Sequence, residues 1–447
     1  MKAIEMITTF QHPPACNFAA NIDLRVDGKW VEVLRTETAD FANLIFDPSN
    51  GPVEVTVIYH DGRKVNEVDI RPWNRNIKAE INEHTFSFIL TQPDKLSLEI
   101  EGRPPLFFWA NPPETDRPDP EDPHVLWFKA GEIHEAAEFT IQDGQTLYIE
   151  GGAVLRGVVR TKNTRNVTLR GYGILDGSND LRGGRRFQHL ARFHHCRGVT
   201  VRDITMIEPS GWMLVPVACE EVEVFNLKQI GEVVSSDGID VVGCRGVHIH
   251  DCFLQNNDDC VVIKALHVSA KNSNPDACDG REDVENVLVE NCTFLNAPSG
   301  NAMEIGHELN TPRVRNVIFR NIDVLCVHGQ GAVFSIHNYA QALVEDICFE
   351  DIRIEHCFDK FLDFRISKSR FSVGEITGRI RNVTLKNIYW HTTPSNAGYT
   401  TSMIGGWSEE ADIQDIKFEN IQIDGKAITS LDELEITTRY ASGLQLL

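Results

Sequence analysis

The chain has no long hydrophobic run: none of its apolar segments approaches the roughly 18 residues that a membrane-spanning helix needs. Basic residues are few, because 43 Lys and Arg stand against 65 Asp and Glu and give a formal net charge of -22. This charge disfavours nucleic acid and anionic membranes as partners, and mildly disfavours a polyanionic substrate. Residues 1–10 lack the apolar core and small-residue site of a signal peptide, so we expect a cytoplasmic protein.

Several chemical motifs are also missing. The chain has no glycine-rich phosphate loop and no serine or cysteine nucleophile constellation. His248 and His250 alternate on one predicted strand, and His194 and His195 are adjacent, but neither pair has a third ligand at metal spacing. We therefore predict no metal and no cofactor. The eleven cysteines are an odd number and mostly lie inside alternating apolar segments, which predicts reduced core residues and not a disulfide framework.

The chain does contain an internal repeat. A short alternating segment that begins as Arg165-Asn166-Val167-Thr168-Leu169 returns every 23 to 40 residues, and self-similarity at such a period marks a repeat architecture. The later copies begin at Arg197, Glu220, Arg245, Glu285, Arg315, Glu345, Arg381 and Gln414. Each copy is followed by a small polar residue and then by a second apolar strand.

The repeat predicts a fold. Alternating apolar and polar residues indicate strands with one buried face, and coils this short leave little room for a crossover helix. Neighbouring copies should therefore stack as parallel sheets, in a right-handed parallel β-helix of about ten coils. The polar residues between the strands suit a bend in the left-handed conformation. They are Asp203, Asn226, Asp251, Asn291, Asn321, Asp351, Asn387 and Asn420.

The first part of the chain differs from the repeat. Residues 1–110 carry short alternating runs separated by turn signals such as His60-Asp61-Gly62, a pattern typical of a β-sandwich. Residues 111–125 are rich in proline and acidic residues and indicate a stiff linker. The sequence thus predicts an all-β protein: a β-sandwich domain over 1–110, a linker, and a parallel β-helix catalytic domain over 126–447.

Three aspartates carry the functional signal. Asp237 lies in Ser235-Ser236-Asp237-Gly238, and Asp258 and Asp259 lie in Asn257-Asp258-Asp259-Cys260, each between two β-rich segments. Carboxylates on adjacent turns of a stacked fold would converge on one patch of surface. Separated carboxylates with room for a water molecule are the apparatus of glycoside hydrolysis with inversion. Turn formation alone is the competing interpretation, because Asp and Asn favour turns.

These motifs resemble a known family. Asp258 and Asp259 follow Asp237 by 21 and 22 residues, which is the spacing of the Asn-Thr-Asp and Asp-Asp-Cys motifs of the polygalacturonases of glycoside hydrolase family 28. The Gly-Tyr-Gly-Ile-Leu-Asp-Gly segment at 171–177 and the Pro-Ser-Gly-Trp segment at 209–212 are similar to two further motifs of that family. The resemblance covers residues 126–425 and implies a parallel β-helix hydrolase.

The chain departs from that pattern at two places. Gly300-Asn301-Ala302-Met303-Glu304 stands where the polygalacturonases carry Gly-His-Gly, and Ser335-Ile336-His337-Asn338 stands where they carry Arg-Ile-Lys. In that family the Arg and Lys grip the substrate carboxylate, so a galacturonan substrate is in doubt. The segment Met303-Glu304-Ile305-Gly306 and the two-domain layout are more similar to the dextranases and isopullulanases of family 49, which cut neutral α-glucans.

The resemblance implies a role for each aspartate. Asp258 would protonate the glycosidic oxygen as general acid, and Asp237 with Asp259 would activate the attacking water. Inversion requires carboxyl groups about 6.5–9.5 Å apart, whereas retention requires about 5 Å. Candidate substrate-binding residues on the same and later coils are Lys264, Trp212, His267, Glu304, His307, His337 and Arg365, while Ser335 and Trp407 are weaker candidates.

Three function classes compete. The first is an inverting glycoside hydrolase, the second a β-helix polysaccharide lyase with an Arg or Lys base and calcium, and the third a non-catalytic carbohydrate-binding β-helix. The spacing of the aspartates favours the hydrolase. We expect a carbohydrate partner, specifically short oligosaccharides that are neutral or carry one uronic acid, in preference to polymeric galacturonan. Homo-oligomer formation stays open.

Overall fold

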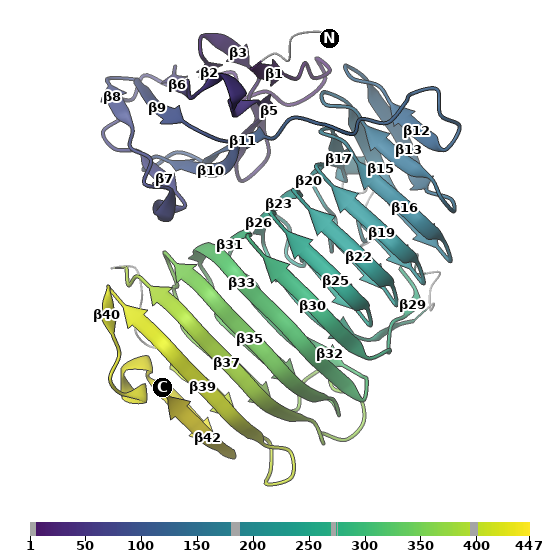
Figure 1. Cartoon of the computed structure of the whole chain (residues 1–447), viewed down its shortest axis with the longest axis vertical. Coiled ribbons are helices and arrows are strands. Elements are labelled where there is room, and N and C mark those ends of the chain that lie inside the picture. Colours follow the sequence, from purple (N-terminus) through teal and green to yellow (C-terminus); the bar gives the residue numbers. More distant parts are fainter. Residues whose placement is uncertain (1–5, 180–187, 270–273, 275, 394–400) are drawn as a thin grey trace. The chain divides into compact units, whose positions relative to one another are not determined.

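The computed structural model describes residues 6–179, 188–269, 274, 276–393 and 401–447 (Figure 1). The chain divides into two compact units. One consists of Met1–His134, Tyr148–Leu155 and Gly171–Ile174, and the other of Glu135–Leu147, Arg156–Arg170 and Leu175–Leu447. Within the described ranges, no helix combines the length and apolar character that crossing a bilayer demands.

The first unit contains a 6-stranded and a 5-stranded sheet. The first sheet comprises β1 (Ile7–Thr9), β4 (Leu34–Arg35), β5 (Asp40–Phe46), β7 (Asp69–Arg71), β10 (Asp94–Glu99) and β11 (Leu106–Asn111). The second comprises β2 (Ile22–Val26), β3 (Lys29–Val31), β6 (Val53–Tyr59), β8 (Glu80–Asn82) and β9 (Thr85–Leu90), and the short 3-10 helices are η1 (Pro48–Asn50) and η2 (Trp73–Arg75). Leu24 and Val55 of the 5-stranded sheet share one buried cluster with Leu44 and Leu98 of the 6-stranded sheet.

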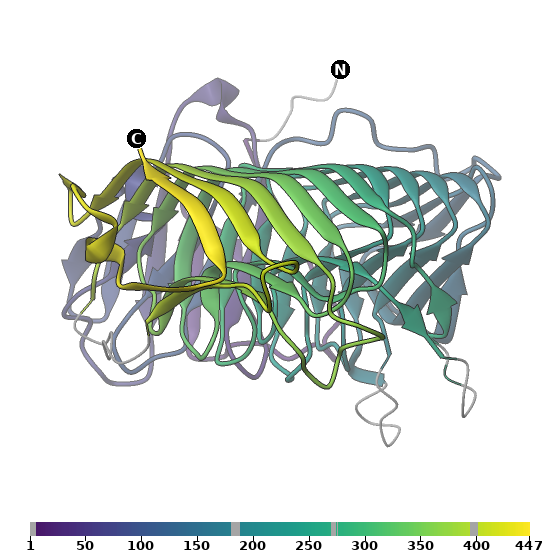
Figure 2. The same cartoon turned by 90° about the horizontal axis from the view of Figure 1, so that it is seen from below.

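The second unit is built from stacked parallel strands, as the repeat predicts. The longest stack runs through ten strands: β16 (Arg165–Arg170), β19 (Arg197–Arg202), β22 (Glu220–Phe225), β25 (Arg245–His250), β30 (Val284–Glu290), β33 (Arg313–Val327), β35 (Leu343–Ile354), β37 (Arg379–Trp390), β39 (Ile413–Ile423) and β42 (Ala441–Leu446). Figures 1 and 2 show these strands as a regular row. The parallel β-helix predicted from the sequence is confirmed.

Two further stacks complete the coils. One contains β20 (Thr205–Ile207), β23 (Lys228–Gly231), β26 (Phe253–Asn256) and β31 (Thr293–Asn296), which pairs with the later part of β33. The other contains β18 (Ala191–His194), β21 (Leu214–Val217), β24 (Ile239–Val242), β27 (Val261–Ala265), β32 (Met303–Leu309), β34 (Ala332–Asn338), β36 (Lys360–Ile366), β38 (Ser402–Gly405) and β41 (Ile436–Arg439). This last stack carries most of the candidate site residues.

The remaining elements are short or lie at the ends of the stacks. They are β12 (Val125–Phe128), β13 (Ile133–Thr140), β14 (Thr146–Ile149), β15 (Val154–Lys162), β17 (Ile174–Asp176), the hairpin strands β28 (His267–Val268) and β29 (Cys278–Asp279), β40 (Lys426–Ala427) and η4 (Leu431–Leu434).

The interior of the coils explains why the copies stack. The first valine of each copy lies in register with the next along the stack, as in Val167, Val199, Val222, Val247 and Val287. All five side chains are buried. A coil cannot bury its apolar face alone, so each copy contributes hydrophobic surface to its neighbours.

The polar residues between the strands have the predicted backbone conformation. All eight have a φ between 50° and 69°. Several of them also form side-chain ladders along the stack: Asn226 donates to Asp203 at 2.8 Å, and Asn321 donates to Asn291 at 2.7 Å. Since an Asn or Asp side chain tolerates the left-handed region and can pair with the coil above, this residue type recurs at the bend.

The cysteines are all free, and eight of the eleven are buried. Three of them form a row on successive coils: the Cys196 amide donates to the sulfur of Cys219, and the Cys219 amide donates to the sulfur of Cys244, at 3.4 and 3.3 Å. They fill the interior as small apolar residues.

Candidate active site

The three aspartates lie where a turn leads into a strand of the β24–β27 stack. Asp237 precedes β24 by two residues, and Asp258 and Asp259 precede β27. The parallel ladder extends into these turns, because the Gly238 amide donates to the carbonyl oxygen of Asp259 at 2.8 Å. Each of the three side chains has a carboxylate oxygen within 4.8 Å of the other two. The structure therefore brings the three predicted catalytic residues together.

Lys264 lies beside this cluster. Its Nζ is 2.7 Å from an oxygen of Asp237 and 2.7 Å from an oxygen of Asp240, and all three side chains are buried. Burial alone would lower the pKa of Lys264, but the two facing carboxylates outweigh it and hold the pKa well above its usual range. The same Nζ lies 3.7 Å from the ring centroid of Trp212, a cation–π contact. Lys264 is thus held in ion pairs inside the site.

Asp258 differs from its two neighbours because its side chain is only partly buried. Burial and the negative charge of Asp237 raise the pKa of Asp258 to about 7, and burial has the larger effect. The positive charge of Lys264 acts in the opposite direction. A carboxyl group with this pKa holds its proton near neutrality and can donate it, which is what a general acid requires.

Asp259 is fixed by Asn301. The backbone amide and the side-chain amide of Asn301 donate to the same oxygen of Asp259, at 2.7 and 2.9 Å. The Asn301 side chain also donates to Glu304 at 3.0 Å. Burial, together with the carboxylates of Glu304 and Asp258, raises the pKa of Asp259 well above its usual range. The orientation of Asp259 therefore depends on a residue one coil further along the stack.

A buried charge network continues from Glu304. His337 Nδ1 lies 3.2 Å from Glu304, His337 Nε2 lies 3.5 Å from Asp363, and Asp363 also pairs with Arg365. Burial would lower the pKa of His337, but the carboxylates of Glu304 and Asp363 raise it to about 9. His337 is therefore a cation at neutral pH. The parallel register explains the network, because Glu304 pairs with Ser335 of β34, and Ser335 pairs with Asp363 of β36.

His307 and Trp212 lie at the edges of this arrangement. The His307 ring stacks on His337 at a centroid distance of 4.7 Å and on Phe371 at 5.2 Å. Burial lowers the pKa of His307 to about 4, so its ring is neutral at neutral pH. The Trp212 ring stacks on His189 at 4.9 Å, in addition to its contact with Lys264. Ser335 completes the set, with its hydroxyl 3.1 Å from His337 Nδ1.

The structure does not bring the remaining two candidates to the cluster. His267 lies on the hairpin strand β28, opposite Asp279 of β29, and half of its side chain is exposed. Trp407 follows β38 and is 41% exposed. The hairpin belongs to the long insertion between β27 and β30, whose path the repeat pattern does not determine.

Three residues of the site were missed by sequence reasoning: Asp240, Asn301 and Asp363. Asp240 lies in the same motif as Asp237, but the motif alone does not show which way a strand residue points. Asp363 and Arg365 are two residues apart on one strand, so their side chains share a face of that strand. Their pairing could therefore have been predicted from the sequence. Asn301 carried no signal beyond its place in the segment that departs from the polygalacturonase pattern.

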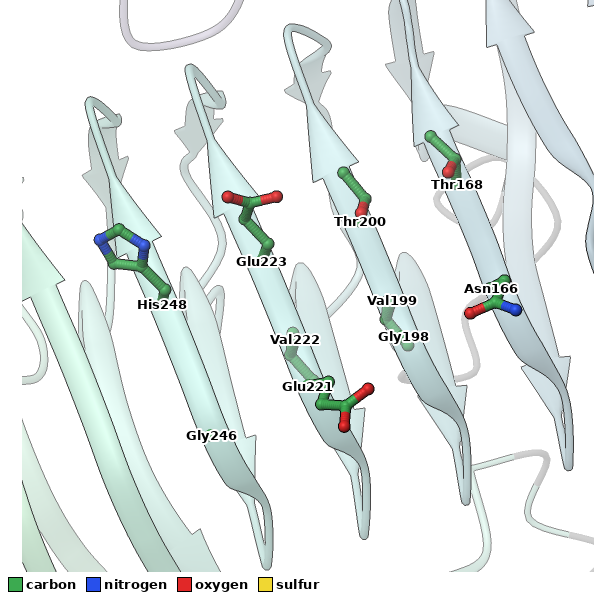
Figure 3. Close-up of a pocket in the computed structure, with 10 residues that line it drawn as sticks. All are labelled: Asn166, Thr168, Gly198, Val199, Thr200, Glu221, Val222, Glu223, Gly246 and His248. Carbon is green, nitrogen blue, oxygen red and sulfur yellow. The ribbon is translucent and has the colours of Figure 1, made fainter.

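A separate hollow lies on the outer face of the longest stack. It is lined by residues of β16, β19, β22 and β25, among them Thr168, Thr200, Glu223 and His248 (Figure 3). Gly246 also lines the hollow, and a Cβ built there would have no neighbouring atom closer than 3.9 Å. None of the three aspartates lines this hollow, so it is distinct from the candidate active site.

The chain was compared with known proteins. Residues 130–333 match the model of the glycosyl hydrolases family 28. A probable rhamnogalacturonase A of Aspergillus oryzae is 28% identical over 135 residues, which is 30% of this chain and 24% of the relative. Rhamnogalacturonase A of Emericella nidulans is 24% identical over 290 residues, which is 60% of this chain and 51% of the relative. These alignments span about a quarter to a half of the relatives' length.

Solved structures with a similar chain path, at low sequence identity, were also found. A family 28 exopolygalacturonase of Yersinia enterocolitica aligns with a TM-score of 0.48 and 12% identity, over 88% of this chain and 96% of that one. The segment matched by the family model contains Asp237, Asp258 and Asp259. The resemblance to family 28 glycoside hydrolases predicted from the motifs is thus confirmed by the family model and by the rhamnogalacturonase relatives.

Proposed function

We propose that the protein is an inverting glycoside hydrolase in which Asp258 is the general acid and Asp237, together with Asp259, activates the attacking water. One observation carries the assignment. Of three clustered carboxyl groups, Asp258 is the partly exposed one and has a pKa raised to about 7, whereas Asp237 lies 2.7 Å from the ammonium group of Lys264. Two carboxyl groups in contrasting environments are the usual division between acid and base.

The reaction follows from these roles. Asp258 donates its proton to the glycosidic oxygen while the bond between that oxygen and the anomeric carbon breaks. A water molecule attacks the anomeric carbon from the opposite face and gives a proton to Asp237. Lys264 donates a hydrogen bond to Asp237 and holds its side chain in place, and Asn301 holds Asp259 in the orientation that positions the water. Release of the product and proton exchange with solvent restore the starting state.

The spacing of the carboxylates does not by itself select inversion. Oxygens within 4.8 Å of one another are closer than the separation of about 6.5–9.5 Å that we expected between acid and base. Inversion is supported by two further aspartates, Asp237 and Asp259, whose oxygens lie within 4.8 Å of each other and can hold one water between them.

The charges around the site bear on the substrate. Lys264 and Arg365 are the two candidate cations for a substrate carboxylate, and each is already paired with an aspartate. A cation that is already paired discriminates weakly for charged sugars. We therefore propose pectin-type oligosaccharides that are neutral or carry one uronic acid as substrates, in preference to polymeric galacturonan. The names of the rhamnogalacturonase relatives agree with a pectin-type substrate.

We further propose that residues 1–110 are a β-sandwich accessory domain. Two sheets that share one buried hydrophobic cluster support this assignment, and residues 112–124 between β11 and β12 contain no strand. The accessory domain carries none of the proposed catalytic residues.

The lyase alternative is less well supported. A lyase needs a Brønsted base, and the candidate lysine and arginine, Lys264 and Arg365, are both held in ion pairs. The pKa of Lys264 is raised by Asp237 and Asp240 even though burial opposes this, so Lys264 is a poor proton acceptor. The three aspartates are close enough to hold a cation such as calcium, which is the one observation in favour of a lyase.

One experiment tests the reaction class. The purified protein is incubated with a panel of pectin-derived and neutral oligosaccharides, and new reducing ends are measured together with ultraviolet absorption. Hydrolysis predicts reducing ends with no absorbing product. Elimination would leave an unsaturated sugar that absorbs in the ultraviolet, and this outcome would replace the hydrolase with the lyase.

A further inference from the structure

Cys326, His328 and His356 form a cluster that takes no part in the proposed hydrolysis. Each offers one ligand atom, the cysteine sulfur or an imidazole nitrogen, within 4.8 Å of the other two. Cys326 is the penultimate residue of β33, His328 follows that strand directly, and His356 lies two residues beyond β35. The ligand atoms thus come from two successive coils, which is why the sequence showed no metal-ligand spacing.

The backbone fixes the two histidines beside each other. Val327 and Cys357 form a parallel bridge between the coils. The Val327 amide donates to the carbonyl oxygen of His356 at 3.0 Å, and the Phe358 amide donates to the carbonyl oxygen of Val327 at 2.9 Å. In this parallel register Cys326 lies opposite His356, and His328 lies one residue beyond the bridge, so the backbone pairing brings all three residues together.

A third coil orients one of the rings. His356 Nδ1 lies 2.6 Å from the hydroxyl oxygen of Thr393, and His356 Nε2 lies 2.9 Å from His328 Nδ1. We assign the proton of His356 to Nδ1, donated to Thr393, so that Nε2 presents a lone pair to the cluster. A histidine ligand that donates its other ring N–H to a neighbouring oxygen is the usual arrangement in metal sites.

We propose that Cys326, His328 and His356 bind a zinc-class divalent cation through one thiolate and two imidazole nitrogens, with water in the fourth position. Zinc favours this mixture of sulfur and nitrogen ligands in a tetrahedral site. His356 is buried, Cys326 is half-buried and His328 is exposed, so the ion enters from solvent on the His328 side.

Binding requires a balanced change of protons. The thiol of Cys326 gives its proton to solvent, while the proton on His328 Nδ1 moves to Nε2 of the same ring. One proton is therefore released for each ion bound, and the affinity increases with pH.

The proposed ion would lie in the same row of turns as Asp258. The His328 amide donates to the carbonyl oxygen of Asn296 at 3.1 Å, and the Asn296 side chain donates to the carbonyl oxygen of Asp258 at 2.7 Å. Two coils at a strand spacing of about 4.8 Å place the ion roughly 10 Å along the stack from Asp258. At this distance the proposed ion does not contact the reacting atoms.

The test uses the full chain, kept reduced and stripped of metal with a chelator, and titrates it with Co²⁺ and then with Zn²⁺. We expect one equivalent of Co²⁺ to produce a thiolate-to-metal charge-transfer band in the near ultraviolet, and Zn²⁺ to abolish it. The band should be absent in Cys326→Ala. In calorimetric titrations, His328→Ala and Thr393→Val should each weaken Zn²⁺ binding at least about tenfold. If Cys326→Ala misfolds, His328→Ala still tests the proposal, because the exposed side chain of His328 can be removed without disturbing the core.

Two matched controls separate this site from other thiols and histidines. Cys348→Ala removes another half-buried cysteine, and His248→Ala disrupts the second cluster with metal-ligand potential, Glu223–His248–His250. Both should keep the Co²⁺ band. Loss of the band in Cys348→Ala, its survival in Cys326→Ala, or the absence of stoichiometric Co²⁺ binding would overturn the proposal. Unchanged affinity in Thr393→Val would overturn the assigned orientation of His356.

Discussion

Replacing Lys264 with methionine tests the electrostatic design of the site. Lys264 Nζ lies 2.7 Å from both Asp237 and Asp240, and the three side chains are buried. Removing the cation leaves two buried carboxylates without compensation. Breaking a buried ion pair in this way costs about 3–5 kcal/mol of the free energy of unfolding. Turnover should also fall strongly, because Asp237 loses the ammonium group that holds its side chain in place.

The loss of stability in Lys264→Met should depend on pH. Burial raises the pKa of Asp240 well above its usual range and Lys264 opposes this shift, so without the cation the folded state prefers a protonated Asp240 even more strongly. The stability deficit of the variant therefore grows as pH rises, and it should be larger at pH 8 than at pH 5. Urea denaturation followed by circular dichroism at both pH values measures the difference.

Lys228 provides a matched control. It is another fully buried lysine of the β-helix, and its ammonium group donates to the carbonyl oxygens of Asp203 and Asn226. Lys228→Met should lower stability without the same dependence on pH and with far less effect on turnover. If Lys264→Met keeps wild-type turnover and stability at pH 8, or if the two variants behave alike, the ion-pair reasoning is wrong.

Four further predictions concern the site. Asp258→Asn should lower kcat roughly 10²–10⁴-fold with an unchanged circular dichroism spectrum; full activity in that variant would refute the acid assignment. Because the general acid must be protonated, kcat of the wild type should fall above about pH 7, the raised pKa of Asp258, and a rate that stays flat to pH 9 would contradict it. The raised pKa of His337, about 9, contributes stability that is complete below about pH 6.5 and is lost as pH rises through 9. Glu304→Gln should shift the NMR titration of His337 to lower pH, and an unshifted titration would contradict the network. Chelation should leave turnover unchanged, whereas a loss restored by calcium would favour the lyase.

The fold could be predicted because the sequence pattern that specifies each coil is short and local. Each coil repeats an alternating strand, and each bend uses an Asn or Asp with positive φ, so residues such as Asn226 and Asn321 reveal the coil boundaries in sequence. The convergence of Asp237 with Asp258 and Asp259 followed from the same periodicity, since positions at equivalent turns of adjacent coils must lie side by side.

The partners of the aspartates were not predictable in the same way. The coils differ in length, so contacts between coils, such as those of Asn301 with Asp259 or of His356 with His328, depend on the exact register. The insertion after β27 forms a hairpin that carries His267 to Asp279, and no repeat pattern specifies its path. Lys264 was recognised as a nearby cation, but its burial between two carboxylates depends on the side-chain directions of two neighbouring strands.

The anomeric configuration of the first product tests the central claim most directly. A preferred oligosaccharide from the substrate panel is cleaved in an NMR tube, and the anomeric proton of the new reducing end is followed before mutarotation. The account predicts that the new end first appears with the configuration opposite to that of the cleaved bond, and that Asp258→Asn forms no product on this timescale. A first product that retains its configuration would contradict the inverting mechanism and would assign one of the aspartates to a nucleophilic role.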